Sequence, residues 1–133
     1  MELIQIGTAH TNFKTREETP RSSTDINDEA EISILPEYID CLKGIRENKF
    51  IFVLCWLHQS NRDVHEVHRR QDYTKPSVGV FNSRSPDRPN PISLTRAELV
   101  KVTENSLIVK NLDLVDGTPV IDIKPYIPHY DSE

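Results

Sequence analysis

The sequence Lys49-Phe-Ile-Phe-Val-Leu-Cys-Trp-Leu-His58 decides the fold class, because it contains the longest apolar run in the chain. Its aromatic and branched side chains favour a β-strand, and apolar residues at both alternating sets of positions indicate a strand covered on both faces. The apolar run has eight residues, whereas a membrane-spanning helix needs roughly twenty. The stretch therefore predicts the central strand of a sheet.

Shorter strands are predicted on either side of this stretch. Ala30, Ile32 and Ile34 alternate with charged or polar residues, which is the pattern of a half-buried strand. Residues 103–105 are a plausible hairpin turn between two further strands. The predicted strands are residues 2–9, 29–35, 49–58, 78–81, 92–102, 106–111 and 120–123. With one short helix predicted over residues 36–46, the pattern favours an all-β barrel or sandwich.

Length and composition indicate one soluble globular domain. The chain has 133 residues, of which 36% are hydrophobic, and its formal net charge is −5. Taken over the whole chain, that charge argues against a nucleic-acid partner. The first residues carry no basic segment followed by a long apolar one, so no signal peptide is visible and we expect a cytoplasmic protein.

Two long polar loops, residues 11–28 and 60–77, are the first candidates for a functional region. The second contains His65 and His68, but their spacing of three differs from the spacing of four in zinc proteases. No glycine-rich nucleotide-binding motif follows a strand, and neither Cys41 nor Cys55 has an obvious local base. These patterns predict no metal site and do not by themselves point to any cofactor.

The segment from Ser77 to Ile92, Ser-Val-Gly-Val-Phe-Asn-Ser-Arg-Ser-Pro-Asp-Arg-Pro-Asn-Pro-Ile, is the most informative loop. Its three prolines restrict the backbone, and a stiff loop loses less entropy when it binds a ligand. Arg84, Arg88 and Asn90 are suited to bind phosphate or carboxylate groups. The alternative is a rigid connector whose arginines pair with the many carboxylates of the chain.

This segment resembles the signature of the TrmO family, Gly-Val-Phe-x-(Ser/Thr)-Arg-(Ser)-Pro-x-Arg-Pro-Asn-Pro-Ile, in which positions 82 and 87 are open. A second specific match is Leu-Asp-Leu-Val-Asp-Gly-Thr-Pro-Val-Ile-Asp-Ile-Lys-Pro-Tyr over residues 112–126. Weaker matches are Trp-Leu-His-Gln over residues 56–59 and Pro-Arg-Ser over residues 20–22. The resemblance covers about residues 2–130, which is nearly the whole chain.

The resemblance implies a single-sheet β-barrel of about six to seven strands that acts as a homodimer. Members use S-adenosylmethionine to methylate N6 of threonylcarbamoyl-adenosine beside the tRNA anticodon. Many bacterial members continue into a second small domain, whereas this sequence ends at Glu133. We therefore expect one methyltransferase domain over residues 1–133, and tRNA as its partner.

The resemblance also implies which residues contact the cofactor. They are Pro20, Arg21, Ser22, His58, Gln59, Arg84, Leu94, Leu112, Asp113, Leu114 and Val115. Arg21 or Arg84 would hold the methionine carboxylate, and Asp113 would face the ribose hydroxyls or the amino group. For His58, the alternative is a strand-end histidine that covers the core.

Three residues are candidates for accepting the proton that leaves the methylated nitrogen, or for orienting the group that does. They are Asp113, Asp116 and Tyr126, and the sequence does not choose among them. Asp116 precedes Gly117 in a turn pattern, where an aspartate is usually structural. Tyr126 would simply pack in the alternative interpretation.

The charges are unevenly distributed along the chain. Residues 62–96 hold seven basic and four acidic residues, whereas the flanking segments are acidic. In this basic region the candidates for binding substrate are Arg69, Arg70, Arg84, Arg88 and Asn90, and Tyr73 and Phe81 could stack on unpaired bases. The alternative is a solvated basic face.

Three other functions stay open at this level. The chain could be a non-catalytic RNA-binding barrel that keeps the cofactor pocket as a relic. It could be a methyltransferase that acts on another adenine-containing substrate. It could also be a structural dimerisation module.

Overall fold

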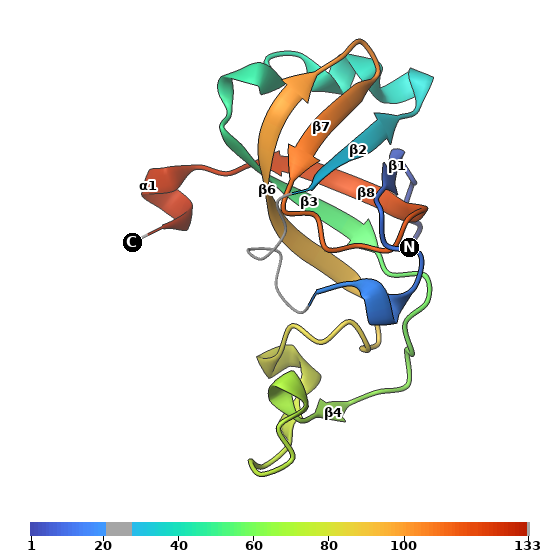
Figure 1. Ribbon diagram of the computed structural model, residues 1–133, viewed down its shortest axis with the longest axis vertical. Coiled ribbons are helices and arrows are strands. Elements are labelled where there is room, and N and C mark those ends of the chain that lie inside the picture. The colour runs from blue at the N-terminus through green and yellow to red at the C-terminus, as the bar shows by residue number, and fades with distance from the viewer. Residues whose placement is uncertain (21–27, 133) are drawn as a thin grey trace.

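The computed structural model describes residues 1–20 and 28–132, and its main feature is a closed six-stranded barrel (Figure 1). The strands are β1 (Gly7–His10), β2 (Glu29–Ile34), β3 (Phe50–Trp56), β6 (Ile92–Val102), β7 (Ser106–Lys110) and β8 (Thr118–Pro125). They follow the order β1-β2-β7-β6-β3-β8, every neighbouring pair is antiparallel, and β8 pairs with β1 to close the ring. The predicted all-β barrel with one short helix is confirmed.

The central strand predicted from the sequence is β3, which pairs with β6 on one side and with β8 on the other. Ile51, Val53 and Cys55 point into the barrel and are fully buried, while the residues between them are half-buried on its outer face. Both faces of β3 are therefore covered, which explains why its sequence is apolar at every position.

Small side chains allow the strands to approach closely inside this narrow barrel. Ala9, Ala30 and Ala97 alternate with branched residues in the core. At Gly7 on β1, an added Cβ would collide with the backbone carbonyl of Ser33 on β2. The close approach of these two strands therefore requires glycine at this position.

One end of the barrel is covered by two 3-10 helices, η3 (Pro36–Leu42) and η4 (Ile45–Glu47) (Figure 1). The apolar side chains predicted to form one helical face, Tyr38, Ile39, Leu42 and Ile45, do pack against the core. The segment is not one α-helix, because Gly44 adopts a left-handed conformation with φ of 82° and divides it.

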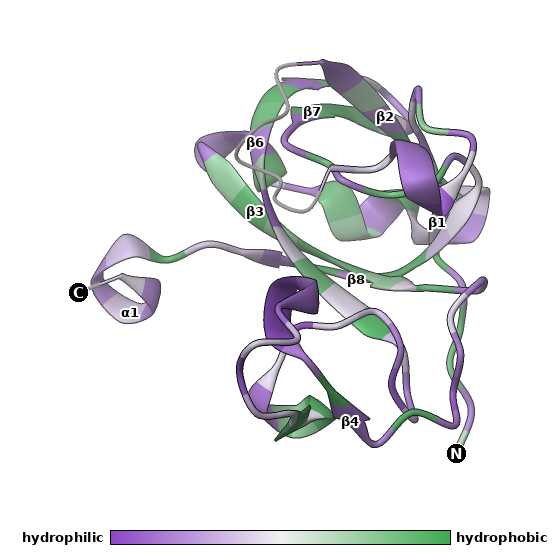
Figure 2. Ribbon diagram, turned by 60° about the horizontal axis from the view of Figure 1, so that its bottom comes forward, coloured by the Kyte–Doolittle hydropathy of each residue, from purple (hydrophilic) through white to green (hydrophobic). Residues whose placement is uncertain are grey.

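The opposite end of the barrel carries a lobe formed by residues 57–91, the long connection between β3 and β6 (Figure 1). The lobe contains a small sheet of β4 (Glu66–Val67) and β5 (Val78–Gly79), and two 3-10 helices, η5 (Arg69–Gln71) and η6 (Val80–Asn82). Figure 2 shows hydrophobic residues along β3 of the barrel, whereas much of the lobe is hydrophilic. The predicted loop over residues 60–77 thus contains short ordered elements, and the predicted strand over residues 78–81 ends at Gly79.

The two ends of the chain differ from the sequence predictions. The first strand begins at Gly7 rather than at residue 2, because Leu3 and Ile4 are exposed and only Ile6 packs against the core. The chain continues past Pro125 into the one α-helix of the described residues, the short α1 (Pro128–Asp131). No helix in the described part of the chain is long and apolar enough to cross a membrane.

Candidate functional site

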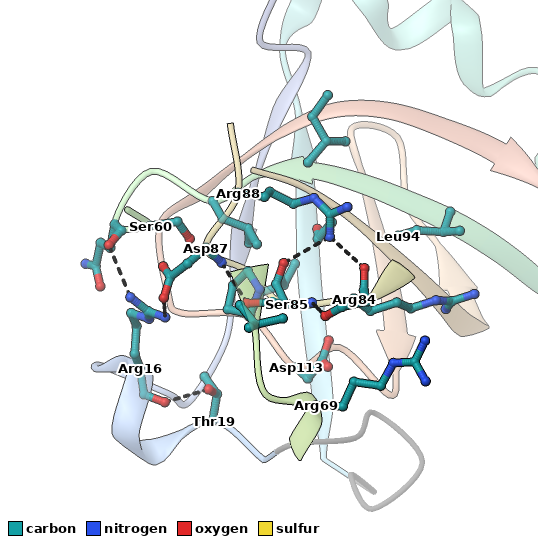
Figure 3. Close-up of a pocket in the computed structure, with 18 of the residues that line it drawn as sticks. Arg16, Thr19, Ser60, Arg69, Arg84, Ser85, Asp87, Arg88, Leu94 and Asp113 are labelled. Atoms are coloured by element: carbon teal, nitrogen blue, oxygen red, sulfur yellow. Dashed lines mark hydrogen bonds and ion pairs between the residues drawn. The ribbon is translucent and has the colours of Figure 1, made fainter. Parts of the chain in front are cut away.

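An open groove lies where the lobe meets the mouth of the barrel (Figure 3). Its walls come from four parts of the chain: the segment that ends at Pro20, the lobe, the start of β6, and the segment before β8. The barrel end covered by η3 and η4 does not contribute to it. Chain segments that are distant in sequence therefore meet at one end of the fold.

Arg88 organises the proline-rich loop from the inside. Its guanidinium donates hydrogen bonds to three backbone carbonyls, those of Val80 at 2.9 Å, Ser83 at 2.9 Å and Ser85 at 3.1 Å. The hydroxyls of Ser83 and Ser85 accept hydrogen bonds from backbone amides two residues further on. These hydrogen bonds hold residues 83–88, which lie outside the helices and strands, in a fixed shape.

Residues 57–62 are joined to the same loop by hydrogen bonds. The Leu57 amide donates to the Pro91 carbonyl at 2.8 Å, and the Arg88 amide donates to the Asn61 carbonyl at 3.1 Å. The Arg62 guanidinium donates to the Pro89 carbonyl at 2.7 Å and to Asn90 at 3.1 Å. This pairing holds His58 and Gln59 at the rim of the groove, where both side chains are exposed.

Asp113 lies where the groove meets the barrel mouth. It follows the buried Leu112, and its carboxylate accepts a hydrogen bond of 3.2 Å from the buried Thr95 hydroxyl on β6. Burial raises the pKa of the Asp113 carboxyl above its usual value. A raised carboxyl pKa in a groove is a common property of groups that exchange protons with a ligand.

The other two candidates for proton transfer do not line the groove. Asp116 fixes the start of the early loop, because its carboxylate accepts a hydrogen bond of 3.0 Å from the Thr11 amide and pairs with Lys14 at 3.4 Å. The Thr11 hydrogen bond lowers the pKa of Asp116. Tyr126 packs against Phe50 and Phe52, with ring centroids 6.1 and 5.5 Å away. Within one copy of the chain, only Asp113 of the three faces the groove.

The structure brings most of the predicted cofactor residues together. Those that line the groove are Pro20, His58, Gln59, Arg84, Leu94, Asp113, Leu114 and Val115. Leu112 is instead a core residue with 1% of its surface exposed. Arg21 and Ser22 lie outside the described residues, so the structure does not place them.

The predicted substrate residues also line the groove, but their side chains differ in what they already bind. They are Arg69, Arg70, Arg84, Arg88 and Asn90. Arg69 donates two hydrogen bonds to the Asn82 carbonyl, at 2.9 and 2.6 Å. Arg84, by contrast, is exposed and has no hydrogen bond or ion pair with any other described residue (Figure 3). Its guanidinium is therefore available to an anionic ligand.

Two aromatic side chains lie at the lobe side of the groove. Tyr73 is 75% exposed and Phe81 is 89% exposed. The ring of His68 lies 4.9 Å from that of Tyr73 and supports it from one side. Exposed rings beside arginines can stack on unpaired bases.

The sequence analysis did not identify Arg16, Ser93 or Thr95, which also line the groove. Ser93 and Thr95 could have been identified from the sequence, because they are polar residues at inward-facing positions of a predicted strand. No local signal existed for Arg16, whose role depends on a contact with Asp87 in the lobe. Among the described residues, no cluster of histidine, cysteine or acidic side chains could hold a metal ion.

Among the described residues, the groove thus offers the unpaired cation of Arg84, the Asp113 carboxylate of raised pKa, and the apolar side chains of Leu94 and Leu114. The buried Cys55 nearby is not a nucleophile, because burial raises the pKa of its thiol to about 12. Such a groove suits a ligand with an anionic group and an extended apolar or aromatic body.

Comparison with curated proteins gives close relatives of similar length. A Methanothermobacter thermautotrophicus protein named as a probable S-adenosyl-L-methionine-binding protein is 44% identical over 99% of this chain and 94% of its own. An S-adenosyl-L-methionine-binding protein of Archaeoglobus fulgidus is 41% identical over 98% of this chain and 93% of its own.

Among solved structures, the fold is similar to crystal structures of TrmO. One from Pseudomonas aeruginosa gives a TM-score of 0.83 at 26% identity and covers 100% of this chain. This chain spans 59% of that longer one. The family model for the tRNA-methyltransferase O N-terminal domain matches residues 8–132. The chain therefore belongs to the TrmO family.

Proposed function

We propose that the protein is an S-adenosylmethionine-dependent methyltransferase that methylates N6 of threonylcarbamoyl-adenosine beside the anticodon of tRNA. Membership of the TrmO family supports the methyltransferase class, and the names of the archaeal relatives support the cofactor. The observation that carries the proposal is the groove, in which the unpaired Arg84 and the carboxylate of Asp113 both face the space between the lobe and the barrel mouth.

The groove residues fit the cofactor by their chemistry. Arg84 would bind the carboxylate of the methionine part, because a guanidinium pairs with a carboxylate through two hydrogen bonds. Leu94, Leu114 and Val115 would contact its apolar parts, and His58 and Gln59 offer polar atoms at the rim. When bound, S-adenosylmethionine supplies a methyl group on a sulfonium, which a nitrogen can attack directly.

Asp113 is the residue that we propose as the proton acceptor. The acceptor nitrogen is conjugated to a carbamoyl group and must lose its proton when it is methylated. The raised pKa of Asp113 brings its basicity closer to what proton transfer near neutral pH requires. Thr95 donates to one carboxylate oxygen, so it would orient the other toward the substrate.

The lobe provides the surface that we propose for tRNA. Arg69 and Arg70 lie beside the exposed rings of Tyr73 and Phe81 on the groove wall. Cations would neutralise phosphates, and the rings would stack on bases that leave the anticodon loop. This local basic surface would attract phosphates although the whole chain carries a net charge of −5.

We further propose that the protein acts as a homodimer in the cytoplasm. Ile92 and Leu94 are 38% and 45% exposed, and they pair across the outer face of β3 and β6 with Trp56 and Leu54. A second copy of the chain would cover the part of this apolar strip that faces away from the cofactor, next to the groove wall to which Ile92 and Leu94 also belong. Light scattering during gel filtration would measure the assembly.

Calorimetry with S-adenosylmethionine, followed by methyl transfer to two tRNA preparations, tests the proposed activity. One tRNA carries threonylcarbamoyl-adenosine and the other is the same tRNA without that modification. We expect binding, and transfer only to the modified tRNA. Binding without transfer to either tRNA would favour a relic RNA-binding barrel or another adenine-containing substrate. Absence of cofactor binding would refute the methyltransferase proposal.

A further inference from the structure

Asp87 connects three parts of the groove wall. It lies in the proline-rich loop, and its Oδ1 atom accepts a hydrogen bond of 2.9 Å from the Asn61 amide. Its Oδ2 atom pairs with the Arg16 guanidinium at 3.3 Å (Figure 3). Arg16 also donates to the Gln59 carbonyl at 3.5 Å. One carboxylate thus links the loop, the segment that carries His58 and Gln59, and the early part of the chain.

Arg16 belongs to the 3-10 helix η1 (Arg16–Glu18), which leads directly into Pro20. The other hydrogen bonds that this short helix forms with described residues are local: the Thr19 hydroxyl donates to the Arg16 carbonyl, and the Lys14 amide donates to Glu18. A 3-10 helix of three residues has little stability of its own. Its position against the groove therefore depends on contacts such as the Arg16–Asp87 pair.

We propose that the ion pair between Arg16 and Asp87 is a positioning device, which holds η1 and Pro20 against the groove and so completes the site for S-adenosylmethionine. This inference rests on the proposed function. It concerns residues that the quoted motifs do not specify, because Asp87 occupies a position that the signature leaves open and Arg16 lies outside the four quoted stretches.

The exposure of the pair sets the size of the effect. The side chains of Arg16 and Asp87 are 41% and 29% exposed, so their attraction is partly screened by water. Loss of such a pair has little effect on the stability of the barrel, whose strand pairing it does not touch. It would increase the freedom of η1, and the cofactor would then have to order this segment when it binds.

Two conservative variants isolate the ion pair. Arg16→Gln removes the charge of one partner. Asp87→Asn removes the charge of the other, while its amide oxygen can still accept the hydrogen bond from the Asn61 amide. A matched control is Lys124→Ala, which removes an exposed ion pair of 2.9 Å with Asp122, outside the groove.

Calorimetry should give a dissociation constant for S-adenosylmethionine that is about two- to fivefold higher in each single variant. The double variant should be no weaker than the single ones, because both remove the same interaction. The exchanged pair, Arg16→Asp with Asp87→Arg, should recover part of the affinity. The melting temperature and kcat at saturating cofactor should stay unchanged, and Lys124→Ala should match the wild type in every measurement.

Hydrogen exchange without any ligand provides an independent measurement. Amides of residues 16–19 should exchange faster in both single variants than in the wild type or in Lys124→Ala. Unchanged cofactor affinity in the two variants, with a wild type that does bind, would overturn the positioning role and leave the proposed function intact. A wild type that binds no S-adenosylmethionine would overturn both.

Discussion

Arg84 and Arg88 lie four residues apart in the same loop, and their replacement by alanine should have opposite consequences. Arg88 donates three hydrogen bonds to loop carbonyls. Arg84 has no hydrogen bond or ion pair with another described residue and faces the groove. We expect Arg88→Ala to destabilise the loop, and Arg84→Ala to weaken ligand binding without destabilising the protein.

The structure allows the effect of Arg88→Ala to be estimated. Each hydrogen bond from a charged donor contributes about 1.5–3 kcal/mol, and water that reaches this half-buried loop would replace part of that. If each of the three hydrogen bonds contributes a net of about 1 kcal/mol, Arg88→Ala lowers the free energy of unfolding by about 3 kcal/mol. In a domain of 133 residues this lowers the melting temperature by about 10 °C when the loop unfolds together with the barrel.

Arg84→Ala removes a contact that forms only with the ligand. A charged hydrogen bond to a carboxylate contributes about 1.5–3 kcal/mol, so affinity for S-adenosylmethionine should fall about 10- to 100-fold. The melting temperature of the unliganded protein should change by no more than about 2 °C, as is usual for an exposed side chain.

Thermal unfolding by circular dichroism and calorimetric titration with S-adenosylmethionine measure the two effects side by side. Arg88→Lys is a useful third variant, because lysine keeps the positive charge but lacks the planar guanidinium that contacts all three carbonyls. A stable Arg88→Ala variant with normal affinity would refute the scaffolding role. Destabilisation by Arg84→Ala would show that this loop acts as a rigid connector, with Arg84 as one of its supports.

Three further predictions concern other parts of the molecule. Burial raises the pKa of Asp113, so the folded protein is destabilised as pH rises from the ordinary carboxyl pKa to the raised one and the Asp113 carboxyl loses its proton. In urea unfolding, Asp113→Asn should therefore be more stable than the wild type at pH 7 and equally stable near pH 3. The same variant should be inactive in methyl transfer. Replacing Arg69 and Arg70 by alanine should reduce the slope of the logarithm of the tRNA binding constant against the logarithm of the salt concentration by about two. Arg46→Ala, at the other end of the barrel, should leave this slope unchanged. Gly7→Ala should lower the melting temperature strongly, because the new methyl group collides with the Ser33 carbonyl, and a normal melting curve would show that β1 and β2 can separate without cost.

The strands of the barrel could be predicted because their alternating pattern is local. The predictions for residues 29–35, 92–102 and 106–111 agree with β2, β6 and β7 to within one residue at each end. The helix over residues 36–46 could not be predicted in its observed form. Its apolar spacing is helical, but the left-handed backbone at Gly44 limits it to short 3-10 turns.

The sequence predicts which residues lie in the candidate site better than it predicts what each side chain does there. The resemblance named Arg84, Arg88, Asp113 and Asp116 together, and sequence gives no way to separate a guanidinium that binds loop carbonyls from one that faces a ligand. Asp113 and Asp116 lie three residues apart, yet one faces the groove and the other anchors the early loop. That difference arises only when β6 and the segment around Thr11 fold against them.

The site and the barrel depend on different residues, and this division has a consequence for the protein. The core consists of inward-facing side chains of six strands, while the proposed substrate residues belong to the lobe between β3 and β6. Because β3 pairs with residues 92–98 of β6 over its whole length, the lobe can change without disturbing these hydrogen bonds. The barrel mouth belongs to both parts, because Thr95 and Asp113 meet there and the core residue Leu114 lines the groove. Substitutions of lobe side chains that support no loop contact, such as Arg84, should therefore alter ligand binding at little cost in stability, whereas substitutions at Arg88 or Thr95 should affect stability and function together.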